Sequence, residues 1–293
     1  MTTDFFPMTM NRRKFIKTSG LAIGATAMAG SLSGSLMGCN IRKSLSFGFQ
    51  TWTLRDQLGE DLPGTLKMMA GMGYREVEFC SPLGYTGTPF EKFNHMSGTE
   101  LKKIIEDSGL ICESSHYGMG ELREHLENRI EWSQQMGITQ IICSSFWLPE
   151  HAGIDEYRKA CDELNMIGAK TKMAGIQCGF HNHHMEFEKR GDELIYDVLM
   201  EQLDPDLVKM QFQVAVVNIG YQAADYFRKY PGRFISAHLA DWSDATSEQV
   251  AIGQGIVNWP DFFEAAKIGG VKNFYVEMEP GTMMESAEYL KEL

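Results

Sequence analysis

From residue 45 to the C-terminus, the sequence alternates short apolar runs with longer segments of helical spacing, and this pair recurs eight times. The apolar runs have the length of buried strands. They cover residues 45–52, 74–80, 110–115, 140–145, 174–180, 207–217, 234–239 and 273–279. The helical segments that follow them cover residues 62–72, 99–108, 121–136, 154–173, 192–202, 223–230, 259–268 and 286–293. Eight strands that each lead into a helix predict a single (β/α)8 TIM barrel of the α/β class.

A doubly wound open sheet is the alternative arrangement for such an alternation. Folds of that kind often carry a glycine-rich phosphate loop after the first strand, and this chain has none there. No low-complexity linker interrupts the pattern, so we expect one domain. Helix boundaries are also marked: Ser97 or Thr99 begins the helix at 99–108, and Asn258-Trp259-Pro260 begins the one at 259–268.

The N-terminus has the features of an export signal. The segment Asn11-Arg12-Arg13-Lys14-Phe15-Ile16-Lys17 is a twin-arginine pattern, and a run of small and apolar residues follows it. That run ends in Leu36-Met37-Gly38-Cys39, which resembles a bacterial lipobox with Cys39 as the lipidated residue. We therefore predict a signal segment at 1–39, a barrel domain at 40–293, and a lipoprotein exported to the periplasm or cell surface. A transmembrane anchor is the alternative, but the run is only weakly hydrophobic.

Charge and cysteine usage exclude several classes of function. The formal net charge is −12 and the isoelectric point is near 5.2, which argues against nucleic acid or an anionic membrane surface as partner. Apart from Cys39, the cysteines are odd in number and show no CxxC spacing. Buried thiols are therefore favoured over a disulfide framework or a zinc cluster. Any contact with a membrane is expected only through the lipid on Cys39.

Polar side chains gather at the C-terminal ends of the predicted strands, where the active sites of such barrels lie. In Phe180-His181-Asn182-His183 the strand pleat places His181 and His183 on one side and Asn182 on the other. The strand-end residues with chemistry to offer are Trp52, Glu78, His116, Ser144, His181, His183, Gln213, His238, Asp241, Glu277 and Glu279. Imidazoles and carboxylates at one mouth are typical of a divalent-metal site. Taken alone, the histidine pair is equally compatible with two satisfied side chains beside a loop.

Several short motifs resemble, in their order and spacing, those of the xylose isomerase-like barrel superfamily and its sugar phosphate isomerase/epimerase group. The motifs are Gly73-Tyr74-Arg75-Glu76-Val77-Glu78, Phe180-His181-Asn182-His183, Tyr230-Pro231-Gly232-Arg233-Phe234, His238-Leu239-Ala240-Asp241, Gly253-Gln254-Gly255 with Asn258-Trp259, and Val276-Glu277-Met278-Glu279. The resemblance covers nearly everything from residue 45 onward.

The resemblance implies one divalent cation held at the ends of strands five to eight, where relatives commonly have Glu, Asp, His and Glu. In this chain the ligand positions fall on His181 or His183, Gln213, His238, and Glu277 in preference to Glu279. Replacing Glu by His and Asp by Gln lowers the ligand charge from about −3 to about −1, which favours manganese, zinc, cobalt, nickel or iron over magnesium. The same replacements are also compatible with a site that binds no metal.

The resemblance further implies a metal-dependent isomerase or epimerase that acts on a sugar or keto-sugar. Such an enzyme removes a proton from the carbon next to a carbonyl and proceeds through an enediolate. Glu277 is the expected catalytic carboxylate, and His183 or His116 is its expected acid–base partner.

The strand ends themselves also offer Trp52, Glu78, Asp241 and Glu279 as candidate substrate-binding residues. Trp52 could instead be an aromatic that only lines the barrel, and Glu78 could form a salt bridge with Arg75 or Arg233. Asp241 could support His238 without touching the substrate.

Two other functions are consistent with the same residues. A 3-keto-glycoside 1,2-lyase would form the same enediolate and then expel the glycosidic substituent by β-elimination. A non-catalytic sugar-binding lipoprotein would keep the barrel and lose the metal, a reading that Gln213 favours. In each case the expected partner is a small-molecule carbohydrate without phosphate, and homo-oligomerisation is left open.

Overall fold

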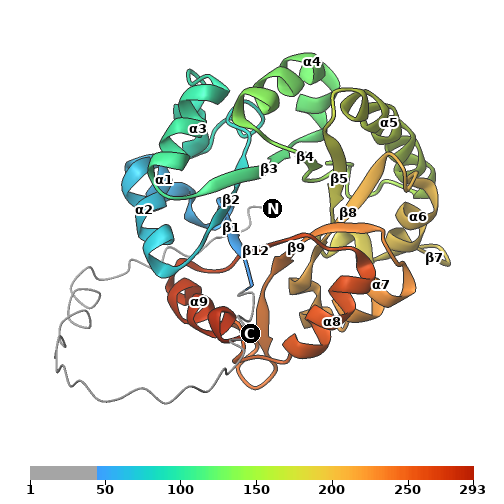
Figure 1. The fold of residues 1–293 in the computed structure, drawn as a ribbon. Coiled ribbons are helices and arrows are strands. Elements are labelled where there is room, and N and C mark those ends of the chain that lie inside the picture. The colour runs from blue at the N-terminus through green and yellow to red at the C-terminus, as the bar shows by residue number, and fades with distance from the viewer. Residues whose placement is uncertain (1–44) are drawn as a thin grey trace, which may run out of the picture. The chain divides into compact units, whose positions relative to one another are not determined.

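The computed structural model describes residues 45–293, which form a closed barrel of parallel strands surrounded by helices (Figure 1). The strands are hydrogen-bonded in the order β1-β12-β9-β8-β5-β4-β3-β2, and the last closes onto the first. Their bounds are β1 (Gly48–Gln50), β2 (Glu76–Cys80), β3 (Ile111–Tyr117), β4 (Gln140–Cys143), β5 (Gln177–His181), β8 (Val208–Gln213), β9 (Phe234–Leu239) and β12 (Asn273–Val276). The predicted single TIM barrel is thus confirmed.

Helices form the outer ring of the barrel (Figure 1). They are α1 (Arg55–Glu60), α2 (Leu62–Met72), α3 (Gly98–Asp107), α4 (Met119–Met136), α5 (Ile154–Met173), α6 (Ile195–Gln202), α7 (Ala223–Lys229), α8 (Trp259–Gly269) and α9 (Met283–Glu292). Short 3-10 helices at Trp52–Leu54, Pro89–Phe93, Met185–Phe187, Val214–Ile219 and Pro280–Thr282 lie in the connections. Two small hairpins, β6 (Lys189–Arg190) with β7 (Glu193–Leu194) and β10 (Asp241–Ser243) with β11 (Glu248–Val250), extend the loops.

The helix-start signals in the sequence act as capping groups. The Ser97 side chain accepts a hydrogen bond from the Glu100 backbone N–H, and the Glu100 carboxylate accepts one from Ser97 N, which makes a capping box. Ser97 therefore begins α3, and Thr99 lies inside it. Asn258 caps α8 by accepting from Asp261 N at 3.2 Å.

Strand β8 illustrates how the pleat divides the barrel into a packed outer layer and a polar interior. Phe212 points outward, and its ring lies 5.7 Å from Phe227 of α7 and 6.1 Å from Phe234 of β9. Its neighbours Gln211 and Gln213 point inward, where both make side-chain hydrogen bonds. The outward layer buries the apolar residues that hold helices to strands, and the inward layer is free to carry chemistry.

The sequence overestimates several strands, and most of all the first and the sixth. The first is only Gly48–Gln50, and a 3-10 helix follows at Trp52. The sixth ends at Gln213 instead of continuing through a β-branched run, because the Gln213 side-chain oxygen accepts from Ala215 N at 3.2 Å and begins a 3-10 helix.

The remaining expectations about the chain concern cysteines and the N-terminus. Cys80, Cys112, Cys143, Cys161 and Cys178 are all free and buried, as predicted. No helix between residues 45 and 293 has the length and hydropathy needed to cross a bilayer. The predicted signal segment 1–39 and Cys39 lie outside the described residues and stay predictions.

Candidate active site

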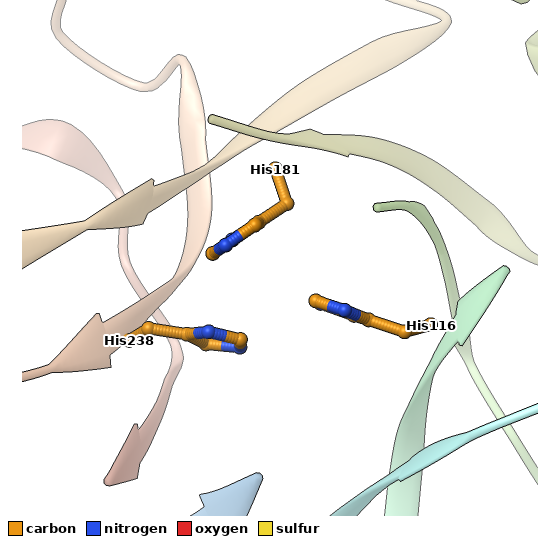
Figure 2. A group of neighbouring side chains, drawn as sticks. All are labelled: His116, His181 and His238. Atoms are coloured by element: carbon orange, nitrogen blue, oxygen red, sulfur yellow. The ribbon is translucent and has the colours of Figure 1, made fainter. Parts of the chain in front are cut away.

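Three buried histidines from three different strands meet in the barrel mouth (Figure 2). His116 lies in β3, His181 is the last residue of β5, and His238 lies in β9. Their ring centroids are 5.0 Å apart for His116–His181, 5.0 Å for His116–His238 and 4.3 Å for His181–His238. One nitrogen of each ring lies within 4.8 Å of the others, so the cluster offers several nitrogen donors at one point.

A fully buried carboxylate, that of Glu78, fixes two of these rings from below. Its Oε2 atom lies 2.5 Å from His238 Nε2 and 3.1 Å from His116 Nε2. Its Oε1 atom accepts a hydrogen bond of 2.5 Å from Ser114 Oγ. Because both rings meet the same carboxylate through Nε2, their Nδ1 edges face away from Glu78.

Gln211, which was not among the predicted site residues, completes this support. Its side-chain nitrogen donates to Glu78 Oε1 at 2.7 Å and to Ser236 Oγ at 2.9 Å. Its oxygen then accepts from His116 Nε2 at 2.6 Å, which assigns a proton to that nitrogen. The only signal in the sequence is its spacing of two residues from Gln213, which places both on the inner face of β8.

The carboxylate of Glu277 lies on the other side of His238. Its Oε2 atom is 2.9 Å from His238 Nδ1 and accepts a hydrogen bond of 2.6 Å from Gln213 Nε2. The imidazole of His238 is therefore held between two carboxylates. Gln213 is satisfied at both ends of its amide, since its oxygen caps the following 3-10 helix.

The electrostatics of this part of the site follow from burial and from the charges of close neighbours. Burial lowers the pKa of His238, but the charges of Glu78 and Glu277 outweigh it and raise the pKa to about 9. Burial raises the pKa of Glu78, yet His116 and His238 bring it well below its usual range. Burial also raises the pKa of Glu277, but the charge of His238 outweighs this and lowers the pKa below its ordinary value. At neutral pH both carboxylates are charged and His238 carries a proton.

His181 and His183 differ from His238, because their pKa values are lowered. Burial lowers the pKa of His181 well below its ordinary value, and repulsion from His238 adds to the effect. Burial also lowers the pKa of His183 to about 4, although the charge of Glu277 opposes this. Both side chains are therefore neutral at pH 7, the form in which an imidazole can accept a proton or bind a metal.

A pocket of about 140 Å³ opens above the histidines. Most of its residues lie at or just beyond the C-terminal ends of strands, as expected for an active site of this fold. It is lined by Gln50, Trp52, Cys80, Tyr85, His116, Ser144, Trp147, His181, His183 and Glu277. This lining, all within the described part of the chain, contains no lysine or arginine.

The histidine pair of the fifth strand lies as the pleat predicts, although the strand itself ends at His181. The rings of His181 and His183 are 4.8 Å apart and both line the pocket. Asn182 points away and accepts a hydrogen bond from Gln213 N at 3.2 Å. Glu186, a loop carboxylate that would be expected to be solvated, is instead buried, and it accepts a hydrogen bond from His183 N at 2.6 Å and so fixes the turn.

The structure brings most of the predicted site residues together, but not all. Trp52, His116, His181, His183 and Glu277 line the pocket, while Glu78, Gln213 and His238 lie beneath or beside it. Of the four predicted substrate-binding residues only Trp52 lines the pocket; Glu78 lies beneath it, and Asp241 and Glu279 lie outside it, so for these three the prediction of a substrate contact was wrong.

The environment of Asp241 explains its position. Its buried carboxylate accepts hydrogen bonds from the backbone N–H of Trp242, Gly253, Gly255 and Val257 and from the Trp259 indole. A Cβ atom on Gly255 would lie 2.1 Å from Asp241 Oδ1, so this close approach requires glycine. Asp241 thus organises the loop between β11 and α8. Glu279 is exposed, and its backbone N–H donates to Gln249.

Comparison with known protein families shows which family this barrel belongs to. The family model for the xylose isomerase-like TIM barrel matches residues 66–293. The chain belongs to the xylose isomerase-like TIM barrel family. A comparison with curated proteins finds no significant match.

Among solved structures, this xylose isomerase-like barrel is similar to a sugar phosphate isomerase/epimerase from Parabacteroides distasonis ATCC 8503. The two share 25% sequence identity with a TM-score of 0.72, over 86% of this chain and 95% of the other. The predicted resemblance to the sugar phosphate isomerase/epimerase group is therefore confirmed.

Two more distant relatives of this xylose isomerase-like barrel hold metal ions. One, from Mycobacterium smegmatis, is in complex with magnesium (14% identity, TM-score 0.59, 84% of this chain and 95% of that one). The other, the IOLI protein, binds a zinc atom (14% identity, TM-score 0.59, 85% of this chain and 94% of that one). At this identity the likeness concerns the fold alone.

The residues of this chain fit a divalent cation on their own evidence. The Nδ1 atoms of His181 and His183 are buried and have no hydrogen-bond partner anywhere in residues 45–293. Leaving a buried polar atom unpaired is costly, so such atoms point to a missing ligand. His238 and Glu277 supply further donors close to them.

Proposed function

We propose that this protein is a metal-dependent enzyme of the isomerase/epimerase type that removes a proton next to the carbonyl of a small, uncharged sugar or keto-sugar. The observation that carries the proposal is that Glu277 and His183, which have different protonation chemistry, line one small pocket directly above a nitrogen-rich ligand set. Kinship with a sugar phosphate isomerase/epimerase supports enzymatic activity in general.

His181, His238 and Glu277 would hold the cation, with Gln213 beside them. When bound, a divalent cation polarises a carbonyl oxygen and stabilises the negative charge that develops there as the neighbouring carbon loses its proton. Imidazole nitrogens outnumber carboxylates in this set, which favours manganese, zinc, cobalt, nickel or iron over magnesium.

Glu277 is the proposed base. Its pKa is lowered, so its carboxylate is charged at neutral pH and able to accept the proton from carbon. Gln213 and His238 both bond its Oε2 atom, which fixes the carboxylate in place. Because it stands alone as a carboxylate in the pocket lining, the same group can return the proton to a neighbouring carbon.

His183 is the proposed partner for the sugar oxygens. With a pKa of about 4 it is neutral at pH 7, and a neutral imidazole can donate from one nitrogen while it accepts at the other. It can therefore exchange protons with a hydroxyl or carbonyl oxygen without carrying a net charge. Glu186 supports this role by binding His183 N and fixing its position.

An uncharged substrate is favoured by the pocket and by the protein as a whole. Without lysine or arginine in its lining, the pocket has no group that would neutralise a phosphate. The net charge of −12 would repel such a substrate as well. Trp52 in the lining offers an aromatic face, which suits the apolar face of a sugar ring.

A 3-keto-glycoside lyase is the second candidate. The pocket pairs one carboxylate with a neutral imidazole instead of two carboxylates. Such an asymmetric pair suits β-elimination, in which one group takes the proton from carbon and the other assists the departing oxygen. Both candidates share the first proton transfer, so Glu277 has the same role in each.

One experiment separates these functions. The protein is treated with chelator, reloaded with manganese or zinc, and incubated with a 3-keto-glucoside in deuterated buffer. Deuterium at carbon two without release of the aglycone supports an isomerase or epimerase, and aglycone release supports the lyase. Binding without exchange or release supports the non-catalytic sugar-binding alternative. Activity that does not depend on the added metal argues against the cation.

We also propose that the protein is exported and attached to a membrane through lipid on Cys39, from the sequence pattern before the barrel. The test is mass spectrometry of the N-terminal peptide from the membrane fraction of cells that express the full chain. A lipidated Cys39 is the expected result. An unprocessed N-terminus, or no change in fractionation for Cys39→Ala, would contradict it.

A further inference from the structure

Trp147 combines two features that are each costly for a large apolar side chain. Its backbone φ is +52°, in the left-handed region that bulky residues rarely adopt. Its side chain is 67% exposed, although it lines the active-site pocket. Strained residues with no structural benefit are found preferentially where function maintains them.

The surrounding chain holds Trp147 in this conformation. The preceding residue, Phe146, is buried, and its ring centroid lies 4.4 Å from that of Phe180 in β5. The Ser145 hydroxyl accepts a hydrogen bond from Trp147 N at 3.2 Å. The chain therefore turns sharply after Phe146, and this turn directs the indole of Trp147 to the rim of the pocket.

A second partly exposed tryptophan, Trp52, lies on the rim after β1. Trp147 follows β4, which is three strands away from β1 around the barrel. Arg55 lies over its ring at 4.6 Å from the centroid, and Tyr85 packs against it at 5.7 Å. The Gln50 side chain accepts from its backbone N–H. Its position is thus fixed by three neighbours, although 37% of its surface remains exposed.

The pocket between these tryptophans is small. Its volume of about 140 Å³ is below the range of about 300–1,000 Å³ that is usual for drug-sized ligands. One sugar ring is the most it can enclose. Any group attached to that ring has to leave through the mouth, where the indoles of Trp52 and Trp147 are the exposed aromatic surfaces of the lining.

We propose that Trp147, with Trp52, forms a second subsite for the ring of a glycosidic substituent on a substrate whose first ring occupies the pocket. This rests on the proposed function and narrows it, because the substrate is then a glycoside and not a free monosaccharide. Indole faces bind the apolar face of a sugar or of an aromatic aglycone by the same packing. The side chain of Trp147 is maintained against its backbone strain for this contact.

The test is calorimetric binding of phenyl β-glucoside and of free glucose to the metal-loaded protein. Trp147→Gly removes the indole and also relieves the left-handed backbone, so the proposal expects no loss of thermal stability. It expects about three- to tenfold weaker binding of phenyl β-glucoside with unchanged binding of glucose. Trp147→Phe should retain most of the discrimination. Met173→Ala, which alters another highly exposed side chain at the end of α5, should change neither affinity.

Equal losses for the two ligands, or none, would overturn the subsite, and so would a failure of the wild-type protein to bind phenyl β-glucoside more tightly than glucose. A lower melting temperature for Trp147→Gly would assign the residue a structural role. Loss of self-association in the variant would assign the indole to a contact between copies instead. Binding is measured without turnover, so the subsite and the proposed reaction can fail separately. If Trp147→Gly weakens only the binding of phenyl β-glucoside and the wild type shows no deuterium exchange, the subsite is upheld and the reaction is refuted. If the wild type exchanges deuterium and Trp147→Gly binds both ligands normally, the reaction is upheld and the subsite is refuted.

Discussion

Oε2 of Glu78 lies 2.5 Å from Nε2 of His238, and both side chains are completely shielded from solvent. On its other side, His238 is 2.9 Å from Glu277, which lines the pocket. The imidazole therefore connects a carboxylate that never reaches solvent to one that does. Glu78 acts on the chemistry through His238 and His116, since it is absent from the lining of the pocket itself.

The first prediction concerns the pH dependence of stability in the metal-free protein. The pKa of His238 is about 9 in the folded state, above the value of about 6.5 for a free histidine. A group with a raised pKa stabilises the fold fully below its unfolded pKa and loses that effect as the pH rises through the folded pKa. We expect the free energy of unfolding in urea, measured with chelator, to fall between pH 6.5 and 9.5.

Glu78→Gln is the diagnostic variant for this effect. It removes one of the two charges that raise the pKa of His238, so the free energy of unfolding should fall less steeply with pH. The variant should also be less stable than the wild type at every pH. Ser114→Ala removes a hydrogen bond to the other oxygen of Glu78 and should leave the decline steep. Parallel curves for Glu78→Gln and the wild type would contradict the coupling.

The second prediction concerns Glu277. Glu277→Gln removes the base and should slow deuterium exchange by about 10²–10⁴-fold, the usual contribution of a positioned general base. Binding of the substrate, measured with the metal at saturating concentration, should change far less, because the amide has nearly the same shape and His181 and His238 remain to hold the cation. Glu279→Gln, two residues along on the exposed side, should remain close to wild type. A fully active Glu277→Gln protein would refute the role assigned here.

Gln213 provides the third prediction. In Gln213→Asp the added negative charge would lie beside Glu277, whose Oε2 atom now receives the Gln213 amide at 2.6 Å. We expect a lower melting temperature than wild type in chelator and a larger rise on adding manganese or magnesium, because the cation offsets the repulsion. The exposed Gln222→Glu variant controls for the added charge. An identical metal-induced shift in all three proteins would count against a cation at this position.

The fourth prediction separates a structural from a substrate-binding role for Asp241. Asp241→Asn places an amide group among five donors, so at least one buried hydrogen bond is lost. We expect the free energy of unfolding to fall by about 1–3 kcal/mol. The kcat and KM of the folded fraction should stay near wild type, and Asp244→Asn, exposed in the loop of the same hairpin, should affect neither. A large rise in KM without destabilisation would instead indicate a substrate contact.

The fold was predictable because its strongest signals are local. Short apolar runs in the strands, helical spacing, and caps such as Ser97 depend on neighbours in sequence. Strand ends were less accessible: the run after Gln213 is rich in valine, yet a side-chain hydrogen bond to Ala215 N turns it into a 3-10 helix. At that point a side-chain hydrogen bond to the backbone outweighs the strand propensity of valine.

The candidate site was predictable in membership more than in arrangement. The rule that barrel active sites lie at strand ends found His116, His181 and Glu277, which all line the pocket. The rule could not predict that Glu78 lies beneath the pocket or that Asp241 lies outside it. Contacts with segments distant in sequence determine both positions. Gln211 was missed for the same reason, since glutamine inside a strand carries no signal of its own.

The position of His238 between Glu78 and Glu277 has a consequence for how the site is filled. A cation that binds Nδ1 of His238 has to displace the proton that this nitrogen shares with Glu277. Filling the site is then an exchange of ions, in which hydrogen ions compete with the metal for the same imidazole. In an acidifying environment, protons would therefore displace a bound cation from this imidazole, and raising the pH would reverse the exchange.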